Sequence, residues 1–346
     1  MGLFRFLLAL SVALSHLHHN EKVITEGFVA VQCFFMLSGF YIFKTLSEKY
    51  IALKTPIRKF YFSRFLRIIP MYWLSFFTLA IWSIVEHKLY PNIPNELASY
   101  VFFMPKFNWL QNLHFAFSNI FIVGLDWFYF IGFTSNYHYY FSKVIIGAQE
   151  LITLKPAWSL SLELMFYLAA PLLVKCKNNI LLPLIFLLLC MRFYFYSIGL
   201  NGLNWVYMFF PFELAIFLLG GLAYRISKKE ILKTEWIKSI LFFLLPILLI
   251  PISFINLNEY SCWVFYVIVF FALAFGNLSP KIFLGIDAFL GKLSYPIYII
   301  HFVAVLMIQA FVKSENYWLY GLLLLVFTMP MLFIQNKINK LRNKII

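Results

Sequence analysis

The stretch WSLSLELMFYLAAP, residues Trp158–Pro171, is apolar enough to enter a membrane but carries one carboxylate, Glu163. An ionisable side chain inside a bilayer is energetically costly, and such residues therefore mark candidate functional sites. In a helix, Ser159, Glu163 and Tyr167 lie four residues apart and share one face. The stretch predicts a membrane helix with a polar stripe, and this stripe requires polar partners elsewhere in the chain.

The composition of the whole chain is typical of an integral membrane protein. Of its 346 residues, 63% are hydrophobic and only 12% are charged, whereas a soluble domain carries about 25% charged residues. The net charge of +14 lies in short basic runs between apolar stretches. This pattern favours loops at an anionic membrane surface over a nucleic-acid-binding face, so we expect contact with lipid and none with nucleic acid.

Apolar stretches near the length that a bilayer requires, about 20 residues, recur along the chain. Each predicts a transmembrane helix, and together they predict an all-α polytopic fold. These stretches are 5–22, 27–43, 68–86, 158–174, 179–199, 205–224, 239–255, 259–276, 293–312 and 317–336.

An eleventh apolar stretch, 115–135, is interrupted by Asn119, Gly124 and Asp126. Lys and Arg are enriched in cytoplasmic loops, which makes their distribution a test of the topology. Ten spans with a cytoplasmic N-terminus place 21 of the 28 Lys and Arg residues inside and 6 outside, whereas an eleventh span gives 11 inside and 16 outside. The distribution therefore predicts about ten transmembrane helices with both termini cytoplasmic.

Residues 87–157 then form a long, aromatic extracytoplasmic segment, which we expect to dip into the membrane as an interfacial or re-entrant piece. Long connections of this kind are usually functional, so the segment is a candidate substrate cover. The N-terminus resembles a signal peptide, but Arg5 and His16 bracket its apolar run, which favours a retained first helix. We find no linker or repeat, and we predict a single membrane domain over 1–346.

Arg5 and His16 are eleven residues apart, so in a helix they share a face about 16 Å apart along its axis. Arg5 is either a snorkelling anchor or a functional cation. His16 is either a packed, hydrogen-bonded histidine or a general base, a task that suits neutral imidazole near pH 7. His18 and His19 follow, but no i, i+4 pair and no Cys or Glu cluster accompanies them, so we predict no metal site.

Two further groups of polar residues lie near or within predicted spans. Arg64 and Arg67 are three residues apart at a predicted cytoplasmic boundary. Their guanidinium groups suit phosphate, although a positive-inside anchor explains the pattern as well. The second group lies within predicted spans. It contains Glu213 and Arg192, which either pair or line a cavity, and the stripe Ser294, Tyr298 and His301. Because lipid offers such residues no partner, several of them in one bundle imply a shared polar cavity.

Five of these segments, in this order, resemble the membrane acyltransferase-3 family, whose members O-acetylate O-antigen, capsule and similar glycans. The segments span nearly the whole chain. They are the pair Arg5 and His16 with ten residues between them, FFMLSGFYI (Phe34–Ile42), RFLRIIPMYW (Arg64–Trp73), WSLSLELMFYLAAPLL (Trp158–Leu173) and LGKLSYPIYIIHF (Leu290–Phe302). The resemblance implies about ten membrane helices with cytoplasmic termini. It is closest to stand-alone members that lack an SGNH hydrolase-like domain.

The resemblance also implies roles for individual residues. His16 corresponds to the essential histidine of the family, and we predict that it acts in catalysis with Glu163, which we expect to orient His16 or an arginine. The arginine pair is associated with acyl-CoA in the family, and we predict donor-binding roles for Arg5, Arg64 and Arg67. The W-S-L-x-x-E motif and the stripe that follows it suggest acceptor-binding roles for Trp158, Ser159 and Tyr167.

The implied reaction moves an acetyl group from cytoplasmic acetyl-CoA to a hydroxyl of a lipid-linked or cell-surface glycan, such as lipopolysaccharide O-antigen, capsule or exopolysaccharide. The implied location is the bacterial inner membrane, and no cofactor is permanently bound. Acyl transfer from a thioester needs a base for the alcohol proton and positive groups for the developing oxyanion. Trp158, Tyr137 and the 87–157 segment would offer aromatic faces to the sugar on the outer side.

A different class of protein also fits a polytopic, aromatic and basic chain, namely a polysaccharide flippase, transporter or polymerase. Transporters are commonly built from related halves with Gly- or Pro-broken helices in matching positions. We find no internal repeat in this sequence. Turnover of acetyl-CoA by the purified protein would separate the two classes.

Overall fold

The computed structural model describes residues 1–17, 27–50, 56–91, 96–133, 139–141, 146–202, 204–229, 231, 234–252, 259–276, 283–311 and 316–345. Helices occupy all ten apolar stretches predicted from the sequence. They are α1 (Gly2–Leu17), α2 (Gly27–Thr45), α3 (Pro56–Leu89), α6 (Ala157–Leu173), α7 (Asn178–Ser197), α8 (Phe210–Ser227), α9 (Glu235–Ile252), α10 (Glu259–Phe275), α11 (Leu284–Phe311) and α12 (Tyr317–Ile345).

Six helices in the described part of the chain are long and apolar enough to cross a membrane, namely α2, α3, α7, α8, α11 and α12. The apolar helices α1, α6, α9 and α10 are shorter. The chain is therefore a multi-pass, mainly helical membrane protein. The count of ten crossings and the cytoplasmic location of both termini stay predictions.

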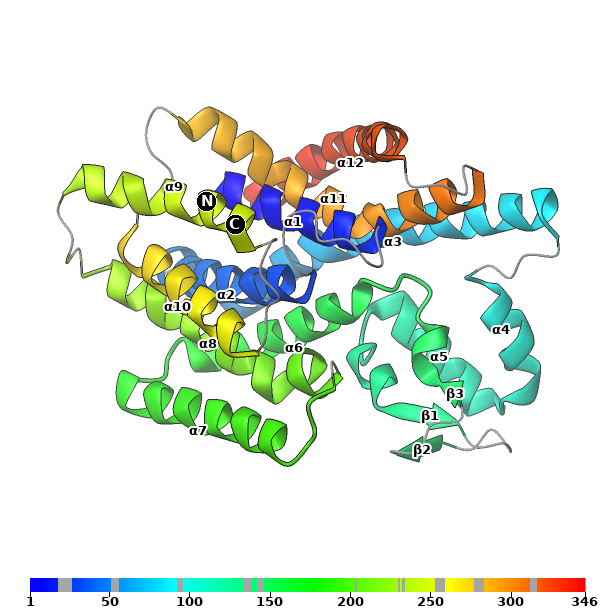
Figure 1. Cartoon of the computed structure of the whole chain (residues 1–346), viewed down its shortest axis with the longest axis horizontal. Helices are drawn as coiled ribbons and strands as arrows, with labels where there is room; N and C mark the ends of the chain where they lie inside the picture. The colour runs from blue at the N-terminus through cyan, green and yellow to red at the C-terminus, as the bar shows by residue number, and fades with distance from the viewer. Residues whose placement is uncertain are drawn as a thin grey trace.

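The interrupted stretch 115–135 is not one helix. Its first part belongs to α5 (Trp109–Phe121), which follows the short α4 (Ala98–Phe103) and ends where Ile122 adopts a positive φ of 62°. A small antiparallel sheet follows, in the order β2 (Tyr139–Phe141), β1 (Ile131–Phe133) and β3 (Ile146–Gly147). The prediction of an all-α fold is wrong for this sheet, whose strands are too short to produce a recognisable alternating pattern. All of these elements gather on one side of the molecule, away from both termini (Figure 1).

We call the described residues between 96 and 151 the outer segment. Its helices, α4 and α5, expose a large apolar surface. The exposed side chains include Val101, Phe102, Trp109, Leu113 and Phe117, with Trp109 71% and Val101 76% accessible. The opposite side of α5 is buried. A short amphipathic helix of this kind is suited to the plane of a membrane interface, and the interfacial location of the 87–157 segment stays a prediction.

Two polar residues that interrupt the apolar stretch attach the outer segment to the membrane helices. The backbone carbonyl of Asn119 accepts a hydrogen bond of 2.5 Å from the Tyr72 hydroxyl of α3. Asp126 accepts a hydrogen bond of 2.6 Å from Ser161 of α6, and burial raises the pKa of this carboxyl. The Asn119 side chain donates a hydrogen bond to the carbonyl oxygen of Leu151 and accepts one from the amide of Thr153. The side-chain bonds of Asn119 and Asp126 therefore explain why polar residues occur in an otherwise apolar stretch.

Arg192 and Glu213, the two intramembrane charges of α7 and α8, form an ion pair. The Arg192 Nη1 atom lies 3.2 Å from Glu213 Oε1, and the Gln32 side chain of α2 donates a hydrogen bond of 2.6 Å to the same oxygen. Arg192 also lies over the ring of Trp263 in α10, 5.2 Å from its centroid. The sequence left open whether these charges pair or line a cavity, and the structure pairs them.

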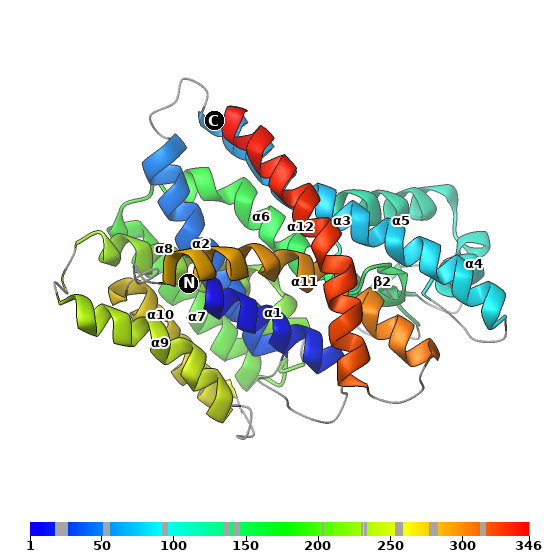
Figure 2. The same cartoon turned by 90° about the horizontal axis from the view of Figure 1, so that it is seen from above.

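The centre of the bundle consists of two closely packed helix pairs, α1 with α11 and α2 with α8 (Figures 1 and 2). Glycines allow α2 and α8 to approach each other closely. A Cβ atom added at Gly39 would lie 1.8 Å from the carbonyl oxygen of Phe217, and one at Gly220 would lie 1.9 Å from that of Met36. Small residues permit this kind of contact between membrane helices, so Gly39 and Gly220 serve the packing of α2 against α8.

Replacing Gly220 with alanine should destabilise the protein by about 2–3 kcal/mol, because the new methyl group pushes α2 and α8 apart. Thermal unfolding in detergent measures the effect. Gly285→Ala in α11 is the matched control, because nothing lies within 4 Å of its added Cβ atom. An equal melting temperature for the two variants would contradict the close approach.

Candidate active site

A narrow cavity of about 70 Å³ lies among five helices, α1, α2, α3, α6 and α11. We call it the inner cavity. Its polar lining includes all three arginines predicted to bind a donor and all three residues of the α6 stripe. The polar residues that line it are Arg5, Ser38, Tyr41, Arg64, Arg67, Ser159, Glu163, Tyr167, Ser294, Tyr295 and Tyr298.

Glu163 is half-buried in this lining and accepts two hydrogen bonds from hydroxyl groups. Ser38 of α2 donates one of 2.6 Å, and Tyr167, one turn further along α6, donates the other to the same oxygen. The carboxylate also attracts the guanidinium groups of Arg5 and Arg67. Glu163 therefore faces arginines, which is one of the two outcomes we expected. Sequence reasoning did not identify Ser38 as its partner.

The three arginines differ in how they are held. Arg64 is 6% accessible and stacks over the rings of Phe60 and Tyr167, with centroid distances of 5.6 and 5.8 Å. Arg5 lies 5.6 Å from the ring centroid of Tyr41. Among the described residues, the side chains of Arg5 and Arg67 make no hydrogen bond. The N–H donors of both guanidinium groups remain available to an anionic ligand. A guanidinium group matches the geometry of a phosphate or carboxylate better than an ammonium group does.

His16 does not line the inner cavity. It lies beside His301 of α11, with ring centroids 4.9 Å apart, and its Nδ1 atom is 2.9 Å from the carbonyl oxygen of Val12. His301 is fully buried, and its Nδ1 atom lies 2.7 Å from the carbonyl oxygen of Tyr298. The structure thus separates His16 from Glu163 and places two histidines together, a pairing that the sequence did not indicate.

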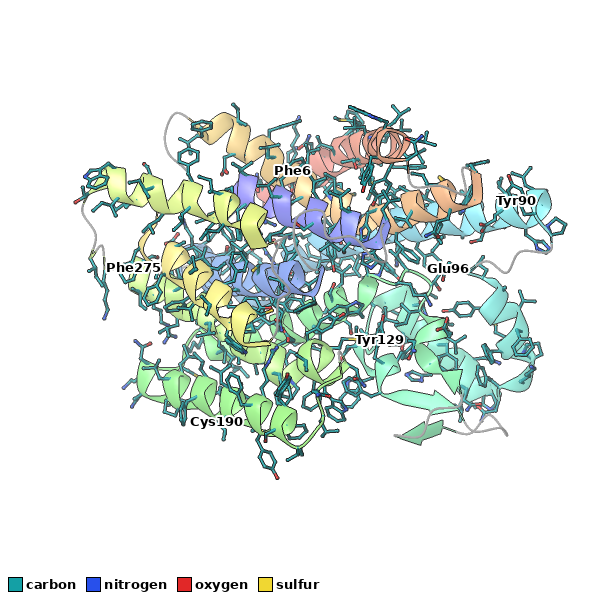
Figure 3. All side chains as sticks on the ribbon, viewed as in Figure 1. Phe6, Tyr90, Glu96, Tyr129, Cys190 and Phe275 are labelled. Atoms are coloured by element: carbon teal, nitrogen blue, oxygen red, sulfur yellow. The ribbon has the colours of Figure 1, made fainter. Side chains whose placement is uncertain are left out.

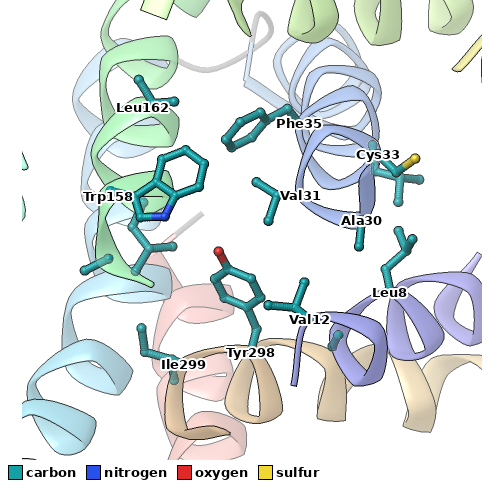
Figure 4. Close-up of a cluster of buried hydrophobic side chains, with 14 of the residues drawn as sticks. Leu8, Val12, Ala30, Val31, Cys33, Phe35, Trp158, Leu162, Tyr298 and Ile299 are labelled. Atoms are coloured by element: carbon teal, nitrogen blue, oxygen red, sulfur yellow. The ribbon is translucent and has the colours of Figure 1, made fainter. Parts of the chain in front are cut away.

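Tyr298 lies between the inner cavity and the histidine pair. Its hydroxyl lies 2.5 Å from the Ser159 hydroxyl of α6, and the residue lines the inner cavity. Figure 4 shows the Tyr298 ring extending from α11 toward α6 and Trp158. The centroid of this ring is 6.1 Å from that of His301, so the histidine pair is next to a residue of the cavity wall.

Trp158, a predicted acceptor-binding residue, is 7% accessible and lies outside the inner-cavity lining. Its ring packs against those of Tyr129 and Tyr207, with centroid distances of 6.3 and 5.2 Å. Tyr129 ends the short 3₁₀ helix Asp126–Tyr129 and is labelled in Figure 3. This aromatic group borders the side of the molecule where we expected the sugar. Tyr137, which we also expected there, lies outside the described residues.

His18 and His19, the remaining candidates for a metal site, also lie outside the described residues. Within the described ranges, no group of three or more His, Cys, Asp or Glu residues could hold a metal ion. Cys190 is exposed on α7 (Figure 3), and Cys33 and Cys262 are buried.

These features define a multi-pass membrane protein with a buried polar cavity suited to an anionic ligand. Residues 1–334 match the membrane acyltransferase-3 family, described as an acyltransferase domain. The chain belongs to this family and is an acyltransferase, as its motifs predicted.

One curated relative adds information about chemistry. YrhL of Bacillus subtilis, which carries the name of a candidate peptidoglycan O-acetyltransferase, is 28% identical over 165 residues. The match covers 47% of this chain and 21% of that protein, so the chain corresponds to about a fifth of the length of this relative. No solved structure matches the chain.

Proposed function

We propose that the chain transfers an acetyl group from acetyl-CoA to a hydroxyl of a lipid-linked or cell-surface glycan at the bacterial inner membrane. The observation that carries this proposal is the inner cavity, where Arg5, Arg64 and Arg67 line one space with the half-buried carboxylate of Glu163 between helices of an acyltransferase. The name of the Bacillus subtilis relative, which refers to O-acetylation of peptidoglycan, supports a glycan hydroxyl as the acceptor. We expect no permanently bound cofactor, and acetyl-CoA is a substrate.

In this proposal the arginines hold the anionic donor, and its narrow pantetheine arm extends through the inner cavity toward Tyr298. His16 removes the proton from the acceptor hydroxyl, whose oxygen attacks the thioester carbonyl. The new C–O bond forms, the C–S bond breaks, and the CoA thiolate takes up a proton. Holding both substrates together makes a covalent enzyme intermediate unnecessary. Family membership favours this reaction over export or polymerisation of a polysaccharide.

In the proposed mechanism, the acceptor sugar reaches the thioester of the donor from the outer side of the membrane. The rings of Trp158, Tyr129 and Tyr207 form an aromatic group there, and Ser159 is one residue further along α6 and hydrogen-bonded to Tyr298. Aromatic faces suit the apolar faces of sugar rings, whereas hydroxyl groups suit their edges. We therefore propose that Trp158 and Ser159 position the sugar, and that Tyr167 acts through its hydrogen bond to Glu163.

The test is a transfer assay with the purified protein in nanodiscs, acetyl-CoA carrying an isotopic label in its acetyl group, and glycan fractions from a bacterial envelope. We expect release of free CoA that depends on the glycan, and a labelled glycan by mass spectrometry. Absence of both products would contradict the proposed function. Mass spectrometry of the surface glycan from cells with and without the protein then identifies the acceptor.

Replacing Arg67 with alanine should raise the KM for acetyl-CoA about tenfold or more, because it removes a charge-assisted hydrogen bond to the donor. Lysine at this position should restore only part of the affinity, because it lacks the planar fork. Arg58→Ala is the control, because Arg58 is exposed on the same helix and lies outside the cavity lining. An unchanged KM together with a lower membrane abundance would make Arg67 a topological anchor instead.

A further inference from the structure

The inner cavity continues into two wider cavities toward the start of α1 and the end of α12. The middle cavity, of about 330 Å³, shares Arg5, Tyr41, Arg67 and Tyr295 with the inner one. The outermost cavity, of about 690 Å³, shares Lys292, Asn339 and Arg342 with the middle one. The three cavities therefore adjoin one another in a row, with larger volumes toward the end of α12, and we call this row the passage.

The wall of this passage is strongly basic. Lys292 and Arg342 line both wider cavities, and Lys337 and Lys340 line the outermost one. The guanidinium of Arg342 is close enough to those of Arg64 and Arg67 to be repelled by them. Like charges gathered in this way destabilise the ligand-free protein and favour a bound polyanion. We call the group Lys292, Lys340 and Arg342 the basic mouth.

Little negative charge offsets the basic mouth. Among the described residues that line the two wider cavities, Asp287 is the only acid. Its carboxylate is engaged by the N-terminal ammonium of Met1 at 3.0 Å, and it accepts a hydrogen bond of 2.8 Å from the Leu3 amide. The basic mouth thus keeps a net positive charge that a phosphate-bearing ligand can neutralise.

The residues of α11 give the length of the passage. Lys292 lines the two wider cavities, Tyr295 lines the middle and inner cavities, and Tyr298 lines the inner cavity. Six residues separate Lys292 from Tyr298, which is about 9 Å along the helix axis. A ligand that reaches from the basic mouth to Tyr298 must therefore carry its anionic groups at one end of a slender arm.

We propose that the basic mouth binds the 3′-phosphate of the CoA nucleotide, with the diphosphate nearer Arg67 and the pantetheine arm in the inner cavity. This inference rests on the proposed function, because it assigns a further part of the same donor. It makes Lys292, Lys340 and Arg342 donor-specificity residues, since they distinguish CoA from the same molecule without its 3′-phosphate. The headgroup phosphate of an anionic lipid has the same chemistry, and the experiment separates the two sources.

The experiment measures binding by calorimetry for the full chain in phosphatidylcholine nanodiscs, with CoA and 3′-dephospho-CoA as probes. For the unmodified protein we expect CoA to bind about tenfold tighter, the value of one charge-assisted hydrogen bond. Arg342→Gln and Lys340→Gln should each abolish most of this difference while leaving the affinity for dephospho-CoA unchanged. Lys344→Gln is the matched control, because Lys344 is exposed on α12 and does not line the passage.

Arg342→Lys tests for loss of fold, because it keeps the charge and should retain most of the discrimination. Equal binding of CoA and dephospho-CoA by the unmodified protein, or an unchanged ratio in Arg342→Gln, would overturn the proposal. So would a loss of retained phosphatidylglycerol in Arg342→Gln, measured by native mass spectrometry, while CoA binding is unchanged, because the site would then belong to a lipid.

The result also separates this inference from the proposed function. Discriminating CoA binding without acetyl transfer would contradict the proposed function and support the basic mouth. Acetyl transfer with equal use of acetyl-CoA and its dephospho form would support the proposed function and contradict the basic mouth. Absence of any CoA binding would overturn both.

Discussion

Replacing His16 with alanine is expected to lower acetyl transfer by about 10²–10⁴-fold, the usual contribution of a general base. The protein should reach its normal abundance in the membrane. The resemblance to the family predicts His16 of α1 as the essential histidine, and in the structure His16 lies beside His301, which is one turn along α11 from the cavity residue Tyr298. The acidic limb of the pH profile of kcat/KM should disappear together with the activity, because that limb reports protonation of the base in the free enzyme.

His114→Ala provides the control for the loss of an imidazole, because His114 is exposed on α5, remote in the chain from this motif. His301→Gln provides a second comparison. If His301 only positions His16, its replacement should lower kcat and leave the acidic limb of the pH profile in place. Normal turnover by His16→Ala, with His18 and His19 intact, would show that His16 is not the base.

Hydrophobic periodicity and charge distribution predicted the helical framework. All ten apolar stretches are helical, and the interrupted stretch 115–135 is not a single helix. The signal is strong because a bilayer demands about 20 apolar residues for each crossing and concentrates Lys and Arg on one side. The small sheet escaped prediction because its strands, of two or three residues, are shorter than any pattern can resolve.

Spacing along single helices predicted the members of the site better than their partners. Arg5, Arg64, Arg67 and the α6 stripe do meet at one cavity. The contacts of Glu163 with Ser38 and of His16 with His301 join helices that are far apart in the chain. Periodicity within one helix does not encode a contact between two helices, so the sequence pattern gave no signal for these pairings. The stripe on α11 was the available signal for His301, because lipid offers those residues no partner.

Glu163→Gln is expected to lower turnover by about 10²-fold in a folded protein, an effect of the size seen when a preorganised electrostatic contact is removed from an active site. The carboxylate accepts hydrogen bonds from Ser38 and Tyr167 and attracts Arg5 and Arg67. Glutamine keeps the volume and one acceptor oxygen, so the hydroxyl groups can remain bonded. It removes the negative charge, which leaves two guanidinium groups uncompensated and free to shift from the geometry that holds the donor.

Two comparisons separate a functional Glu163 from a structural one. Glu150→Gln, in an exposed ion pair with Lys155 on the outer segment, controls for the loss of a carboxylate and should leave turnover unchanged. Ser38→Ala removes one hydrogen bond but keeps the charge, so it should lower turnover much less than Glu163→Gln. A structural role would instead lower the melting temperature of Glu163→Gln with normal turnover per folded molecule. The functional outcome follows from the balance of charges, because a half-buried carboxylate among three arginines organises an anion-binding site, whereas stabilising the helix contacts alone would not require its charge.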